Sequence, residues 1–256
     1  MRKPQICLGT IALETNRWST RIPSYLVSDW IEKIQTAGFE GIELWENHVL
    51  KSDKEAEKIK ESGIPVMVYN TYAGFTDSDD DKKARIKASE MINYLDAGAV
   101  KYNIGNDPKL FNEYKKNVQV FAESLPKSCA LLCELHGGTL MENNNTAQVF
   151  FDGLCPQKFA IVAHPFISPE DLQTKFDYFG KRIVHIHSQL SLGDAHVCLE
   201  RRAEHVNACV NIMKDSGFTG NFTIEFTELT NSPGENIDDL FANAVKDMAY
   251  IRKLWP

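Results

Sequence analysis

FAIVAHPFISPEDLQTKFDYFGKRIVHIH, residues 159–187 of the chain, places two apolar runs on either side of a helical pattern. The first run covers residues 159–163 and the second covers residues 182–186. Ser168-Pro169-Glu170 begins the helical pattern, because serine is a favoured N-cap and proline suits the first helical turn. Apolar runs that do not alternate with polar residues are typical of parallel strands covered by helices. The stretch therefore predicts a strand–helix–strand unit.

The same unit recurs along the whole chain. Further apolar runs lie at residues 6–9, 41–45, 65–69, 99–104, 129–134 and 222–226. Helical patterns separate them at residues 27–37, 53–61, 82–95, 108–124, 199–215 and 237–253, with a short one that ends near Leu154. Eight such units close into a barrel, and a barrel of about 250 residues commonly forms one domain. We predict an α/β protein, a (β/α)8 TIM barrel that forms a single domain over residues 1–256.

An open, doubly wound sheet is the alternative architecture. Such a sheet usually carries a glycine-rich turn after its first strand, where it binds a dinucleotide. In this chain Gly9 is followed by Thr10-Ile11-Ala12, so that fingerprint is absent. The barrel is therefore the favoured prediction.

The overall composition indicates which kinds of partner and which cell compartment to expect. Hydrophobic residues make up 43% of the chain and charged residues 25%, which is typical of a globular protein in water. The net charge of -7 argues against a nucleic-acid-binding surface. No apolar run reaches the roughly 18 residues that span a bilayer, and no signal peptide follows Arg2 and Lys3. We expect a cytoplasmic protein that binds neither nucleic acid nor membrane, and a homo-oligomer is compatible with the sequence.

Acidic and imidazole side chains follow the last four predicted strands, and these residues are Glu134, His164, His187 and Glu225. In a TIM barrel the active site lies at these carboxyl ends of the strands. Two inward carboxylates repel each other, and a divalent cation removes that repulsion while it orders the histidines. Mixed oxygen and nitrogen ligands suit Mn²⁺, Zn²⁺ or Co²⁺, and suit Mg²⁺ less well. The sequence therefore predicts one divalent metal ion bound by these four residues.

Alternation along the strands places further candidates beside this site. Glu134 and His136 share a face, so His136 is a candidate acid or base above the metal. Glu134 and Glu225 are the other catalytic candidates. His185 shares a face with His187 but lies deeper, as a support or a substrate contact.

The earlier strands supply the remaining candidate substrate contacts, which are Glu43, Trp45, Tyr69 and Lys101. Lys101 could bind a substrate oxygen or phosphate, or it could extend from the strand end to solvent. Glu43 could act as a second acid or base or could pair with Lys101. Trp45 could line a ring-shaped substrate or pack in the core. We expect His48 on a loop surface, without a role in the site.

Several of these pieces together resemble the xylose isomerase-like TIM-barrel superfamily of the sugar phosphate isomerase/epimerase type. They are residues 38–45, Glu134-Leu135-His136, His185-Ile186-His187 and Ile224-Glu225, and the resemblance extends over essentially the whole chain. Members typically hold one divalent metal with a Glu, an Asp, a His and a Glu. The resemblance implies Glu134, His187 and Glu225 as ligands. In these members the Asp commonly stands three residues before a His, and in this chain that position holds Ile161. Either His164 takes the place of the Asp as a ligand, or the metal has only three protein ligands. We favour His164 as the fourth ligand.

Within that superfamily, residues 38–45 and the Glu-x-His of strand five look especially like those of the 3-dehydroshikimate dehydratases. The resemblance implies His136 as the base and Lys101 as a basic residue that contacts substrate. One departure is Gln189, which stands where a basic residue is expected after the strand-seven histidine.

Three functions follow as expectations. The first is a metal-dependent isomerase or epimerase that acts on a small sugar or sugar phosphate by enolisation next to a carbonyl. The second is a lyase like 3-dehydroshikimate dehydratase, which acts on a cyclic hydroxyketone. The third is a non-catalytic sugar-binding barrel with a degenerate metal site, which the missing Asp favours. The sequence leaves the choice among them open, as it does the phosphorylation state of the substrate.

Overall fold

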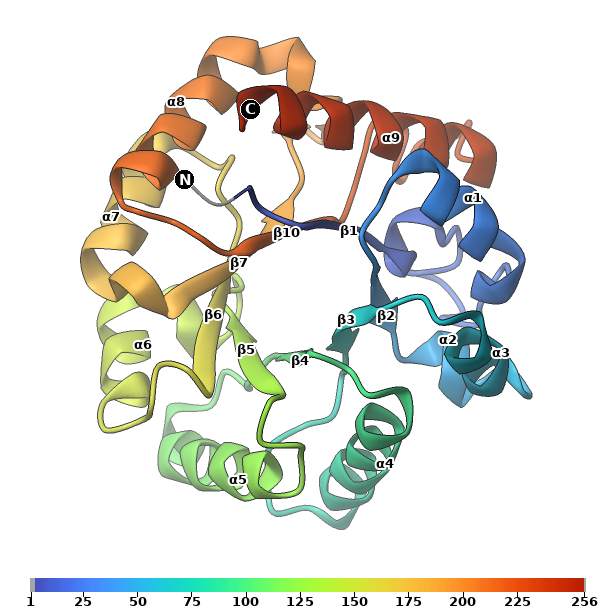
Figure 1. Cartoon of the computed structure of the whole chain (residues 1–256). Coiled ribbons are helices and arrows are strands. Elements are labelled where there is room, and N and C mark those ends of the chain that lie inside the picture. The colour runs from blue at the N-terminus through green and yellow to red at the C-terminus, as the bar shows by residue number, and fades with distance from the viewer. Residues whose placement is uncertain (1–2, 256) are drawn as a thin grey trace.

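A computed structural model describes residues 3–255 of the chain. In it, eight parallel strands close into a barrel in the order β1-β10-β7-β6-β5-β4-β3-β2, and the helices form an outer ring around the strands (Figure 1). Every neighbouring pair of barrel strands is parallel. The predicted (β/α)8 TIM barrel is therefore confirmed.

The strands and the longer helices follow one another as the sequence predicts, and one short helix after β2 is additional. The barrel strands are β1 (Ile6–Gly9), β2 (Ile42–Trp45), β3 (Val66–Asn70), β4 (Ala99–Tyr102), β5 (Ala130–Glu134), β6 (Phe159–Ala163), β7 (Ile183–Ser188) and β10 (Asn221–Ile224). The α-helices are α1 (Ile31–Ala37), α2 (Asn47–Leu50), α3 (Glu55–Ser62), α4 (Asp79–Leu95), α5 (Phe111–Glu123), α6 (Asn144–Phe151), α7 (Pro169–Phe179), α8 (Ala203–Asp215) and α9 (Ile237–Leu254).

Local capping explains where several of these helices begin and end. The Ser168 side chain accepts a hydrogen bond from the backbone of Asp171, and Pro169 occupies the first turn of α7. Ser78 caps α4 in the same way, ahead of three aspartates that favour the positive end of the helix dipole. Gly38 ends α1 with a φ of 97°, a conformation that L side chains rarely adopt.

Apolar side chains pack on both the outer and the inner face of the barrel strands. The larger layer fills the space between the strands and the helices, and the smaller one lies inside the barrel around Val68, Ala99, Leu132, Ala160 and Val162. Side chains alternate between these layers along each strand. The inward positions near the carboxyl ends of the strands are polar instead, which makes that end of the barrel interior the place for chemistry.

Three local features differ from the sequence-based expectation. The stretch between β7 and α8, for which the sequence predicts neither a strand nor a helix, holds an antiparallel hairpin of β8 (Ser191–Leu192) and β9 (Ala195–His196). The predicted helices at 27–37, 108–124 and 199–215 each begin with a turn of 3-10 helix. His48 is wrongly predicted on the surface: it is fully buried in α2, between the rings of Tyr25 and Trp45, and burial lowers its pKa to about 3.

Within the described part of the chain, every helix falls short of the length or the apolar character needed to cross a membrane.

Candidate metal centre at the barrel mouth

Four side chains from neighbouring strands meet inside the barrel near its carboxyl end. Glu134 ends β5, His164 follows β6, His187 lies in β7 and Glu225 follows β10. All four are buried, and one potential ligand atom from each lies within 4.8 Å of the others. The structure thus brings together the same four residues that the sequence proposes as metal ligands.

The contacts within this cluster are close but incomplete. Nε2 of His164 lies 2.8 Å from Oε1 of Glu134, and Nδ1 of His187 lies 3.0 Å from Oε1 of Glu225. Oε2 of Glu134 has Lys101 as its ion-pair partner, but Oε2 of Glu225 and Nδ1 of His187 make no directed hydrogen bond to any described residue. Buried polar atoms without such bonds are costly, and a bound cation would satisfy both of these atoms at once. The donor set therefore fits a metal ion.

The electrostatic surroundings favour positive charge at the same point. Burial by itself would lower the pKa of His187, but Glu225 and Glu43 outweigh that effect and raise this pKa well above its ordinary value. Burial would raise the pKa of Glu134, but the charge of Lys101 and the two histidines hold it well below its ordinary value. A divalent ion supplies the positive charge that these carboxylates favour. Two carboxylates and two imidazoles form a donor set that suits Zn²⁺, Mn²⁺ or Co²⁺ better than Mg²⁺.

Lys101 is a buried member of this site. Its Nζ lies 2.5 Å from Oε2 of Glu134, and only 3% of the residue is exposed. Burial alone would lower the pKa of Lys101, but Glu134, Tyr72 and Glu225 together raise it. Of the two sequence-based alternatives, extension into solvent is therefore wrong, and the ammonium group stands within the site as the partner of a metal-ligand candidate.

Glu43 and His185 lie one layer deeper in the barrel than the four-residue cluster. Oε2 of Glu43 accepts a hydrogen bond from Thr223 Oγ1 at 2.7 Å and lies 2.9 Å from Nε2 of His187, while Oε1 accepts one from Asn70 at 3.1 Å. Nε2 of His185 lies 2.7 Å from the same Thr223 hydroxyl. Sequence reasoning missed Asn70 and Thr223, although both occupy inward positions of their strands, β3 and β10.

The remaining residues proposed from the sequence are Tyr69, Trp45 and His136. Tyr69 packs in the apolar layer between strands and helices, and Asn70 takes the inward position on β3. Trp45 is fully buried against Ile11 and Phe226 and packs rather than lining an open site. His136 is exposed in the loop that follows β5.

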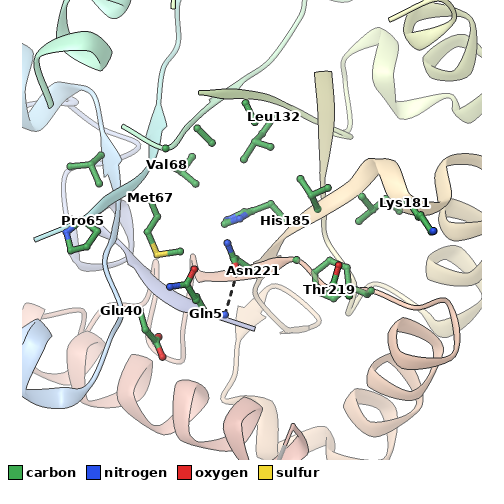
Figure 2. A pocket seen from close by; sticks show the side chains of 18 of the residues that line it. Gln5, Glu40, Pro65, Met67, Val68, Leu132, Lys181, His185, Thr219 and Asn221 are labelled. Atoms are coloured by element: carbon green, nitrogen blue, oxygen red, sulfur yellow. Dashed lines mark hydrogen bonds between the residues drawn. The ribbon is translucent and has the colours of Figure 1, made fainter. Parts of the chain in front are cut away.

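Two cavities lie at opposite ends of the barrel. The larger, of about 900 Å³, opens at the amino ends of the strands, where Met67, Asn221 and His185 point into it (Figure 2). The smaller, of about 390 Å³, lies at the carboxyl end and is lined by His136, His164, Leu135, Phe166, Ile167 and Gln189. The cavity at the amino end is larger, but His164 of the four-residue cluster lines the smaller one at the carboxyl end. The smaller cavity is therefore the candidate substrate site.

No family model matches the sequence, and no curated protein matches it. Solved structures do share the fold. The probable 3-DHS dehydratase AsbF of Bacillus anthracis is 17% identical, with a TM-score of 0.70 over 97% of this chain and 98% of that one. A D-psicose 3-epimerase is 13% identical, with a TM-score of 0.71 over 98% and 99%. The IOLI protein, whose structure holds a zinc atom, is 17% identical, with a TM-score of 0.66 over 96% and 97%.

These likenesses establish the architecture. The chain shares the TIM-barrel fold of these proteins over nearly its whole length. The identities are too low to carry an activity from one protein to another, because one barrel architecture hosts many chemistries. Function has to be derived from the site itself.

Proposed function

We propose that the chain is a metal-dependent isomerase or epimerase that acts on a small sugar or sugar phosphate by enolisation next to a carbonyl. The observation that carries this proposal is the buried convergence of Glu134, His164, His187 and Glu225. Their atoms match the donors of one divalent ion, Mn²⁺, Zn²⁺ or Co²⁺ in preference to Mg²⁺. The epimerases that share the fold over nearly the whole chain give the proposal further support.

Glu134 and Glu225 have different roles in the proposed reaction. A divalent ion held at this centre would polarise the substrate carbonyl and make the neighbouring carbon acidic. Glu134 is held between Lys101 and His164, so it is suited to binding the ion rather than to moving a proton. Glu225 has two oxygens and Oε2 makes no hydrogen bond among the described residues, so, with one oxygen on the ion, we assign to the other the removal of the proton next to the carbonyl.

The cavity above the centre accounts for substrate orientation. His136 and Gln189 line it and can hydrogen-bond to substrate hydroxyl groups, while Phe166 and Leu135 cover apolar faces of a sugar and restrict water. Return of the proton to the neighbouring atom gives an isomer, and return to the opposite face of the same carbon gives an epimer.

A lyase like 3-dehydroshikimate dehydratase is the second candidate. Two observations favour it: His136 lines the same cavity as His164, and Lys101 places a buried ammonium group in the site. In that reaction His136 would take the proton, and loss of a β-hydroxyl would follow. The likeness to the Bacillus anthracis dehydratase is compatible with it.

Metal content of the purified protein tests the shared part of both candidates. We expect about one equivalent of a divalent metal per chain by elemental analysis, and a loss of that metal in Glu134→Ala. A wild-type protein that stays free of metal, and whose melting temperature does not respond to Mn²⁺ or Zn²⁺, would instead support the non-catalytic sugar-binding barrel.

Proton exchange then separates the two reactions. Metal-loaded protein is incubated in D₂O with D-psicose, D-fructose and their phosphates, and deuterium next to the carbonyl is followed by NMR. The same protein is mixed with 3-dehydroshikimate, and a new conjugated chromophore is sought by absorbance. Metal-dependent exchange without the chromophore supports the epimerase, and the chromophore supports the lyase.

A further inference from the structure

Glu43 is the most heavily bonded carboxylate beneath the metal centre. It lies in β2, is 1% exposed, and contacts Asn70 of β3, His187 of β7 and Thr223 of β10. It therefore joins four strands of the barrel at one point. A buried charge with so many partners is fixed in position, because moving it would break several hydrogen bonds at once.

The two ring nitrogens of His187 face in opposite directions. Nδ1 faces the metal centre, 3.0 Å from Oε1 of Glu225 and 3.6 Å from Oε1 of Glu134. Nε2 faces away from it, 2.9 Å from Oε2 of Glu43. Both nitrogens therefore face carboxylates, which can only accept hydrogen bonds. A metal ion at the centre needs the lone pair of Nδ1, so the hydrogen of the metal-binding ring belongs on Nε2, toward Glu43.

We propose that Glu43 is a positioning residue for the metal centre: it holds His187 with its hydrogen on Nε2 and turns the Nδ1 lone pair toward the ion. A carboxylate that accepts the free N–H of a metal-binding histidine fixes the ring and strengthens it as a ligand. This inference rests on the metal-binding part of the proposed function.

His185 and Thr223 complete the support beneath Glu43. The Thr223 hydroxyl donates to Glu43 at 2.7 Å, so the same oxygen is left to accept from Nε2 of His185 at 2.7 Å. A hydrogen-bonded chain thus runs from His185 through Thr223 to Glu43. Because His185 donates into this chain of hydrogen bonds, we assign it the supporting role, one of the two roles that the sequence suggests.

The same hydrogen bonds exclude a second metal site. Glu43, His185 and His187 also gather three potential ligand atoms within 4.8 Å. In this group, however, both oxygens of Glu43 already accept hydrogen bonds, and Nε2 of His185 is engaged with Thr223. Oε2 of Glu225 and Nδ1 of His187, which lack directed hydrogen bonds to the described residues, both belong to the four-residue cluster, so a single ion above Glu43 satisfies the geometry.

His164 offers an internal comparison. Its Nδ1 lies 2.7 Å from the side-chain amide of Gln189, which is a neutral partner. A carboxylate oxygen, Oε2 of Glu225, also lies 3.8 Å from that nitrogen, but it belongs to the metal centre itself, whereas Glu43 behind His187 is not one of the four ligand candidates. Removing the charge of Glu43 should therefore affect metal binding more than removing the amide of Gln189.

Metal affinity of the whole protein tests the proposal. We would measure Zn²⁺ and Mn²⁺ dissociation constants by chelator competition for the wild type, Glu43→Gln, Gln189→Leu and Thr223→Val, with Glu228→Gln as control. Glu228 lies at the same end of the barrel but bonds Arg201 and the backbone of Cys198. We expect Glu43→Gln to weaken binding about 10- to 100-fold, the other two site variants less, and the control not at all.

A readout in the wild type keeps the test independent of variant folding. In metal-loaded protein, ¹⁵N-edited NMR of the histidine rings should show the hydrogen of His187 on Nε2. A hydrogen on Nδ1 would overturn the proposal, as would an unchanged dissociation constant in folded Glu43→Gln. If the wild type binds no metal, the proposed function itself fails, and that outcome is distinct from a wild type that binds normally while Glu43→Gln has no effect.

Discussion

Lys101 and Glu134 form a buried ion pair in which Nζ lies 2.5 Å from Oε2, and both residues are almost completely removed from solvent. The pair connects β4 to β5 at the edge of the candidate metal centre. Removing one partner of such a pair leaves the other charge uncompensated in a medium that solvates it poorly. The metal centre gives that charge an alternative partner, which leads to the first prediction.

Lys101→Met should destabilise the metal-free protein by about 3–5 kcal/mol, because Glu134 loses its buried counter-charge. Urea unfolding with and without Zn²⁺ measures the effect. We expect a smaller loss when Zn²⁺ is present, since the ion compensates the carboxylate. The exposed Lys58 on α3 supplies the control, and its replacement by methionine should change stability by less than about 0.5 kcal/mol. An equal loss for Lys101→Met in both conditions would show that the ion does not reach Glu134.

Divalent metal should stabilise the folded chain by mass action. At a free Zn²⁺ concentration of about 100 times the dissociation constant, the gain is about 2.7 kcal/mol, which corresponds to about 5–10 °C in melting temperature for a chain of this size. Differential scanning fluorimetry with Zn²⁺ and with EDTA measures the shift. Glu134→Ala should lose most of it. A shift of the same size in that variant would mean that Zn²⁺ binds elsewhere.

Much of this arrangement can be predicted from the sequence. The apolar runs give the ends of the eight strands to within about two residues, and the polar residues at the ends of the last four strands identify Glu134, His164, His187 and Glu225. These predictions succeed because they use local patterns and one rule about barrels. They need no knowledge of how one strand is aligned with the next.

The positions of the residues that support the candidate site depend on how neighbouring strands are aligned. The pairing of β2 with β3 shifts register between Ile42 and Glu43, which sets Glu43 opposite Val68. The inward position near the end of β3 is then Asn70 rather than Tyr69, and no single-strand pattern reveals the shift. The contacts of Glu43 with Asn70 and Thr223 likewise join residues far apart in sequence. The burial of His48 could not be predicted for the same reason, because it depends on contact with Tyr25, which comes from a different loop.

Asp247 in α9 should make stability fall as the pH rises. Burial, together with the nearby charge of Glu228, raises the pKa of Asp247 from its ordinary value to about 7. Between about pH 4 and pH 7 the folded state therefore holds a proton that the unfolded state has released, so the free energy of unfolding decreases as the pH increases. Asp247→Asn keeps an oxygen for the backbone N–H of Leu199, which Asp247 Oδ1 accepts at 2.8 Å.

Chemical denaturation of the wild type and Asp247→Asn at pH 5 and pH 8 measures this effect. We expect the variant to gain stability relative to the wild type at both pH values, and to gain clearly more at pH 8 than at pH 5. Glu228→Gln should raise the wild-type stability at pH 8 by a smaller amount, because it removes one of the charges that oppose ionisation. A variant that is less stable than the wild type at pH 8 would contradict the assignment of a costly buried carboxylate.

The last prediction concerns which group moves the proton. If Glu225 removes the proton next to the carbonyl, Glu225→Gln should lower the rate of solvent exchange about 10²- to 10⁴-fold at saturating Zn²⁺, whereas His136→Asn should mainly raise KM through lost substrate contacts. The opposite ranking would assign the base to His136 and favour the lyase. Metal content is measured on each variant, because Glu225 is also a ligand candidate. A rate lost in proportion to the metal would identify Glu225 as a ligand alone.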